Sequence, residues 1–91
     1  MPELRLSRRT RLEIAALPPA IGAAVLSTLT ALAANPWEVG KPLEGRYLGM
    51  WVLRVGNYRV LYTIEGPEAR ATVVVRGVKH RALAYRRRRQ K

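Results

Sequence analysis

Two alternating apolar segments that meet at Gly56-Asn57 constrain the fold of this chain more than any other feature. They span residues 50–55 and 58–64. Glycine and asparagine accept the positive φ angles of a two-residue turn, so the sequence predicts a tight antiparallel hairpin. A turn of this length fixes the register, and it places Val55 opposite Tyr58 and Arg54 opposite Arg59.

The two faces of the predicted hairpin differ in charge. Side chains alternate along a strand, so one face carries only uncharged residues and is predicted to be core. These residues are Trp51, Leu53, Val55, Tyr58, Val60, Tyr62 and Ile64. The other face carries Arg54 directly opposite Arg59, and like charges in this position destabilise a sheet. Either the pair forms a fork for an anion such as phosphate, or both arginines reach solvent at the hairpin end.

Metal and thiol chemistry have few candidate side chains here. The 91 residues contain no cysteine, no aspartate, a single histidine (His80) and six scattered glutamates. A thiolate nucleophile, a zinc site and a carboxylate cluster for Mg²⁺ are therefore not expected. We expect neither metal nor cofactor, and one small domain over residues 1–91.

The charge balance points to a polyanionic partner. The net charge is +11, and eight of the 17 basic residues lie between Arg76 and Lys91, the last of them in a basic tail at 86–91. Nucleic acid and an acidic protein both fit this balance. The uncharged stretch within residues 17–37 forms a helix of about 24 Å, too short for about 30 Å of hydrocarbon, so no membrane span is expected. Arginines interrupt the N-terminal region, and we expect a cytoplasmic protein.

The order of the remaining segments predicts an α+β fold. Residues 3–6 alternate as an edge strand, and Ser7 is a suitable N-cap for a helix that runs from 8 to about 17. Two prolines separate this helix from a second one over about 19–34. Residues 37–49 are predicted as a loop and 71–76 as a third strand, whose alternation adds Arg76 to the Arg54 face. We therefore expect a helical hairpin packed on one face of an antiparallel sheet.

Five segments, in this order, resemble the RelE/ParE toxin superfamily and imply a RelE-like fold. They are Asn35-Pro36, Gly40-Lys41-Pro42-Leu43, Leu48-Gly49, residues 53–62, and Val78-Lys79-His80-Arg81-Ala82-Leu83-Ala84-Tyr85. The resemblance covers nearly the whole chain, and the ordered set is more specific than any single segment.

The resemblance implies the toxin of a type II toxin–antitoxin system. Its RelE branch enters the ribosomal A site and cuts messenger RNA without metal, by activating a ribose 2′-OH to attack the adjacent phosphate. Arg59 matches the hairpin arginine that contacts the scissile phosphate, and Lys79 matches another catalytic basic position. Tyr85 matches a C-terminal tyrosine that stacks on a base or assists proton transfer. The residues expected to bind RNA phosphates are Arg54, Arg76, Arg81, Lys41, Arg86 and Arg87.

The sequence departs from some RelE proteins in one respect. They carry two lysines on the strand before the turn, where this chain has Met50 and Val52. The general base is therefore unassigned, with His80 as the first candidate and Glu44 as the second. His80 can instead orient the turn after the last strand, and Arg81 can instead pair with a glutamate or cap backbone carbonyls.

Two rival functions stay open. A ParE-like protein would poison DNA gyrase with no nuclease activity of its own, and the missing lysines favour it. A family member without toxicity would only bind its antitoxin. In each case the resemblance implies an acidic, RelB-like antitoxin in a heterotetramer or larger complex; messenger RNA and the ribosome are further partners of a RelE-like toxin.

Overall fold

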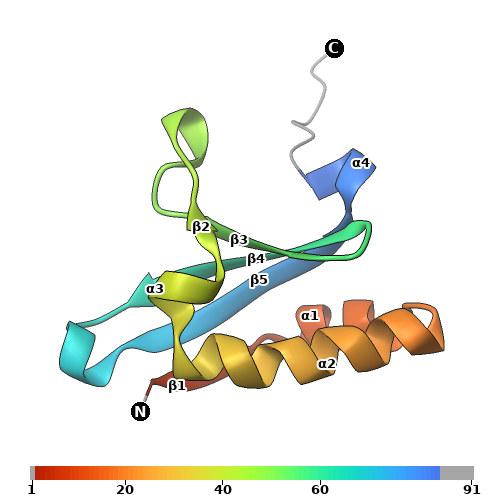
Figure 1. Cartoon of the computed structure of the whole chain (residues 1–91), viewed down its shortest axis with the longest axis horizontal. Coiled ribbons are helices and arrows are strands. Elements are labelled where there is room, and N and C mark those ends of the chain that lie inside the picture. Colours follow the sequence, from red (N-terminus) through yellow and green to blue (C-terminus); the bar gives the residue numbers. More distant parts are fainter. Residues whose placement is uncertain (1, 85–91) are drawn as a thin grey trace.

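The computed structural model describes residues 2–84 and shows a five-stranded sheet with the two longest helices on one face (Figure 1). The strands are β1 (Glu3–Leu6), β2 (Lys41–Pro42), β3 (Trp51–Val55), β4 (Tyr58–Glu65) and β5 (Thr72–His80), in the spatial order β1-β5-β4-β3-β2. The helices are α1 (Arg8–Ala15), α2 (Pro19–Ala34), α3 (Pro36–Val39) and α4 (Arg81–Ala84), with 3₁₀ turns η1 (Gly45–Tyr47) and η2 (Glu68–Arg70). The predicted α+β fold is confirmed.

The β3–β4 hairpin has the predicted register. Its pairs run from Val55 opposite Tyr58 to Trp51 opposite Tyr62, with Arg54 opposite Arg59. Gly56 has a φ of 59°, and within residues 2–84 positive φ angles occur only at glycines, so Asn57 does not have one. A positive φ at the first turn position alone is the pattern of a type II′ turn, which matches the twist of the flanking strands.

The predicted core face of the hairpin is the face that the helices cover. Val60 and Tyr62 are fully buried there, and Val55 is nearly so. The helices contribute Ile14 from α1 and a stripe of apolar residues from α2. This stripe consists of Val25, Leu29 and Leu32. Within residues 2–84 no helix combines the length and apolarity needed to cross a bilayer.

Helix α1 is fixed to β5 by a chain of hydroxyl hydrogen bonds. Ser7 is its N-cap, as predicted, and the Ser7 Oγ accepts a bond from the Thr10 amide at 3.1 Å. The same hydroxyl donates to Thr10 Oγ1 at 3.0 Å, and Thr10 Oγ1 donates to the Val75 carbonyl at 3.2 Å. The buried threonine thus links the helix to the middle of the strand.

Three details differ from the sequence-based expectation. Strand β1 pairs parallel with β5, so the sheet is antiparallel except at this edge. The predicted loop 37–49 contains the end of α3, the two-residue β2 and η1. The predicted strand 71–76 was too short, because β5 continues to His80 by pairing with the first half of β4. Lys79 and His80 therefore lie on the strand and not in a turn after it.

Candidate phosphate-binding site

Three cationic residues lie side by side across the strands on the face that α1 and α2 leave uncovered. Arg54 on β3 is opposite Arg59 on β4, and Arg59 is opposite Lys79 on β5. Directly paired residues share a face of the sheet. In Figure 1 the η1 segment and α4 rise on this side of the sheet, away from the long helices. We call Arg54, Arg59 and Lys79 the cation row.

A β-bulge determines that Lys79 belongs to the row. Tyr62 pairs with Val75 and Leu61 pairs with Gly77, so Arg76 is an extra residue in β5. Strict alternation from the buried Val75 would place Lys79 on the helix-covered face, and the extra residue moves it to the open face.

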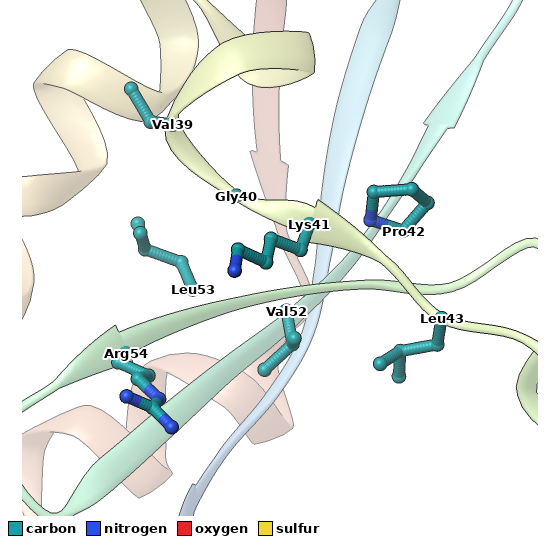
Figure 2. A pocket seen from close by; sticks show the side chains of 8 residues that line it. All are labelled: Val39, Gly40, Lys41, Pro42, Leu43, Val52, Leu53 and Arg54. Carbon is teal, nitrogen blue, oxygen red and sulfur yellow. The ribbon is translucent and has the colours of Figure 1, made fainter.

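Lys41 extends the basic surface beyond β3. It is opposite Val52, two residues from Arg54 and on the same face. Both basic residues line a pocket of about 450 Å³ together with Val39, Gly40, Pro42, Leu43, Val52 and Leu53. Figure 2 shows the Lys41 side chain extending from β2 in the direction of Arg54. An apolar floor beside two cations suits a nucleotide, whose base is apolar on its faces and whose phosphate is charged.

A buried hydrogen bond fixes the segment that carries Lys41. Tyr62 Oη donates to the Pro36 carbonyl at 2.7 Å and joins α3 to the sheet. Burial raises the pKa of Tyr62 to about 12. A β-carbon on Gly40 would lie 2.1 Å from Tyr62 Oη and 2.8 Å from the Val52 carbonyl oxygen, so only glycine fits between them. The close packing places β2 against the edge of β3.

The cations differ in how they are neutralised. Arg54 is exposed and has no hydrogen-bond or ion-pair partner among residues 2–84. Arg59 donates to the Tyr58 carbonyl at 3.2 Å, which holds it at the hairpin end without neutralising it. Lys79 forms an ion pair with Glu13 at 2.5 Å. The two arginines therefore present the uncompensated charge of the row.

Arg76 lies on the same face but is engaged elsewhere. Its Nε donates to Thr63 Oγ1 at 3.1 Å, and its guanidinium forms an ion pair with Glu65 at 2.5 Å. Thr63 is four residues along β4 from Arg59, about 13 Å along the strand direction, so the Arg76 guanidinium is held on the side away from the row. The structure does not bring Arg76 together with the row.

His80 lies on the other face of β5, opposite Tyr58, with the two rings edge to face at 5.3 Å. Its Nδ1 accepts a hydrogen bond from the Ala82 amide at 3.1 Å, which caps the first turn of α4. In a neutral imidazole whose Nδ1 accepts, the proton is on Nε2. His80 therefore offers a donor at Nε2, whereas a general base needs an acceptor there.

The other candidates are spread over the end of the sheet or lie beyond the described residues. The Arg81 side chain is exposed, and its backbone amide donates to the Asn57 carbonyl at 2.7 Å, which ties α4 to the hairpin turn. Glu44 is exposed before η1. Tyr85, Arg86 and Arg87 lie outside the described residues. No three histidine or glutamate side chains within 2–84 come together as a metal-binding group.

Glu13 is a residue of this site that the sequence did not reveal. It is on α1, and its carboxylate contacts both Val78 and Lys79, which are more than 60 positions away in the chain. A local pattern carries no signal for such a contact. The sequence carried one signal for the bulge. The alternation of residues 71–76 changes at Gly77, which marks a possible irregularity in the strand.

Comparison with known proteins agrees with this architecture. Residues 4–85 match the family model of the ParE toxin of type II toxin–antitoxin systems, parDE. The chain is 40% identical over 85 residues to Toxin RelG of Mycobacterium tuberculosis, covering 92% of this chain and 95% of the relative.

Two solved structures are also similar. The toxin–antitoxin complex RelBE2 of Mycobacterium tuberculosis has a chain that is 37% identical, with a TM-score of 0.77, covering 89% of this chain and 100% of that one. The archaeal RelE–RelB complex of Pyrococcus horikoshii has a chain with the same fold at 21% identity, with a TM-score of 0.73, covering 91% and 98%. The protein thus belongs to the RelE/ParE family of type II toxin–antitoxin toxins.

Proposed function

We propose that this toxin cleaves messenger RNA in the A site of the translating ribosome, without metal and by attack of a ribose 2′-OH. The observation that carries the proposal is the cation row, in which Arg54, Arg59 and Lys79 line up across three strands of the open face. A ribosomal target also assigns the protein to the cytoplasm.

In the proposed reaction a base removes the 2′-OH proton, and the 2′ oxygen attacks the adjacent phosphorus. The bond to the 5′ oxygen of the next nucleotide breaks, and that oxygen takes up a proton. The products are a 2′,3′-cyclic phosphate and a 5′-hydroxyl end. Negative charge grows on the non-bridging phosphate oxygens in the transition state, and fixed guanidinium groups stabilise it there. This is the role we assign to Arg54 and Arg59, with Lys79 beside them.

The flanking residues bind the rest of the substrate in this proposal. Lys41 contacts a neighbouring phosphate, and the pocket between β2 and β3 accommodates the adjoining base. Arg81 extends the RNA-binding surface beyond β5. Tyr85, Arg86 and Arg87, which lie outside the described residues, are further proposed RNA contacts. His80 and Glu44 are the two candidates for the base, and His80 can accept the 2′-OH proton only when its Nδ1 gives up the hydrogen bond from the Ala82 amide.

An acidic antitoxin is the proposed storage partner. The matched chains of Mycobacterium tuberculosis and Pyrococcus horikoshii come from toxin–antitoxin complexes. A net charge of +11 favours an acidic partner by electrostatic complementarity. Co-expression with a small acidic protein encoded beside the toxin should give a stable complex, a heterotetramer or larger, and failure to find any such partner would contradict this part.

The test of the nuclease mechanism is Arg59→Ala, with Arg70→Ala as the matched control. Arg70 is an exposed arginine in η2, at the opposite end of β4, so the control removes the same charge away from the row. Loss of one preorganised electrostatic contact costs on the order of 10²-fold in rate. We expect Arg59→Ala to lose message cleavage, measured by primer extension on translating ribosomes, while antitoxin binding and melting temperature stay near wild type.

Two results would refute the mechanism: intact A-site messages with the wild-type protein, or normal cleavage by Arg59→Ala. The second candidate function, ParE-like poisoning of DNA gyrase, is favoured by the ion pairing of Lys79 and by Met50 and Val52, which stand where some RelE proteins carry two lysines. Wild-type protein that leaves messages intact and traps cleaved DNA on purified gyrase would establish this alternative.

A further inference from the structure

The carboxylate of Glu13 connects helix α1 to the end of β5 through two contacts. Its Oε1 accepts a hydrogen bond from the Val78 amide at 3.0 Å, and its Oε2 accepts one from Lys79 Nζ at 2.5 Å. The side chains of Glu13 and Lys79 are 21% and 37% exposed. The pair is therefore partly shielded, and its attraction is less screened than that of an ion pair in open solvent.

The geometry of the strand edge creates the place for this carboxylate. Strand β1 pairs with β5 only as far as Leu6 opposite Val75, so the following part of β5 has no strand on that side. Val60 faces Val78 across the β4–β5 ladder, and the Val78 amide donates to Glu13 instead of to a strand. Glu13 thus replaces the missing strand at this point.

The Lys79 stem and the Glu13 carboxylate both lie close to Gly77. A β-carbon there would lie 3.4 Å from Lys79 Cε and 3.5 Å from Glu13 Oε1. The Lys79 stem therefore passes beside the bare backbone of Gly77, on the open face, to the edge of the sheet. One contact of Glu13 fixes its own carboxylate to the backbone, and the other fixes the ammonium group.

We propose that Glu13 is a positioning residue that holds Lys79 at the end of the cation row for contact with the RNA phosphate. The inference rests on the proposed nuclease function. A lysine ammonium has three donors on a flexible stem. One donor is used by Glu13, which leaves two for a phosphate oxygen and restricts the stem before substrate arrives. Catalytic rate depends on this kind of preorganisation, because small displacements of a charged group weaken its effect in the transition state.

The test is a double-mutant cycle with Glu13→Gln and Lys79→Ala. Glutamine keeps an oxygen acceptor for the Val78 amide and removes only the charge. We expect Glu13→Gln to lower kcat for cleavage by about tenfold with little change in KM, as expected for a misplaced catalytic group. Because Glu13 acts through Lys79, adding Glu13→Gln to Lys79→Ala should change kcat no further. Glu13→Asp, which keeps the charge on a shorter stem, should lie between wild type and Glu13→Gln.

Glu3→Gln is the control, since it removes a carboxylate and an ion pair with Arg5 at the other end of the sheet. It should leave kcat and KM unchanged, and thermal melting should show all variants folded. If the wild-type protein cleaves RNA but Glu13→Gln has a normal kcat, the positioning role is wrong and the proposed function stands. The same conclusion follows if the effects of Glu13→Gln and Lys79→Ala on kcat are additive in the double variant. A wild-type protein without cleavage activity overturns the proposed function and this inference with it.

Discussion

Replacing Tyr62 with phenylalanine tests the buried hydrogen bond that joins α3 to the sheet. Tyr62 is fully buried, and its Oη donates to the Pro36 carbonyl at 2.7 Å. Phenylalanine keeps the ring and its stacking on Trp51, whose centroid is 6.1 Å away, but leaves that carbonyl without the donor. Removing one partner of a buried pair costs about 1–3 kcal/mol. We expect the free energy of unfolding to fall by about 2 kcal/mol, or Tm by about 8–16 °C for a domain of this size.

The same variant isolates a pH dependence. Burial raises the pKa of Tyr62 from 10.0 to about 12. Between these values the unfolded state loses the phenol proton and the folded state keeps it, so the stabilisation is complete below pH 10 and is lost as pH rises through 12. A pKa difference of one unit corresponds to about 1.4 kcal/mol. The contribution of Tyr62 to the free energy of unfolding therefore falls by about 2–3 kcal/mol between pH 10 and 12. The stability difference between wild type and Tyr62→Phe should therefore narrow from pH 9 to 12.

Urea unfolding followed by circular dichroism measures both quantities, with Tyr58→Phe as the control. Tyr58 is a partly exposed tyrosine on the same face, and no hydrogen bond from its hydroxyl is present among residues 2–84. Its replacement should change the unfolding free energy by less than about 0.5 kcal/mol. A Tyr62→Phe variant as stable as wild type, or a stability difference that stays constant from pH 9 to 12, would refute the reasoning.

Two further substitutions test features around the site. Gly40→Ala should destabilise the fold by about 2 kcal/mol or more, because the added methyl group overlaps Tyr62 Oη and the Val52 carbonyl; an unchanged urea midpoint would contradict this packing. Ser7→Ala removes the N-cap of α1 and should cost about 1 kcal/mol in the same assay, whereas Ser27→Ala, on the exposed side of α2, should be neutral.

Features that depend on residues close together in the chain could be predicted from the sequence. The β3–β4 register followed from the two-residue turn at Gly56-Asn57 and from the alternation on either side of it. The start of α1 at Ser7 and the extent of α2 followed from a cap and from prolines. Arg54 and Arg59 could therefore be placed on the open face from local pattern alone.

Features that depend on tertiary contacts were not predictable. Strand β2 has only two residues, one of them a proline, and it exists because Gly40 packs against Tyr62 and Val52. The extension of β5 depends on pairing with β4 across a bulge. The contact of Glu13 with Lys79 joins residues 66 positions apart, so it arises only when α1 packs beside β5.

The extra residue at Arg76 decides how β5 tolerates a change in length. Deleting Arg76 would remove the bulge and leave a regular ladder, in which Val78 and Lys79 keep their present faces and only the contacts of Arg76 with Thr63 and Glu65 are lost. The bulge thus lets this strand carry one residue more or less without moving the cation row. In a sequence alignment of such toxins, a one-residue gap beside Arg76 is therefore compatible with an intact row.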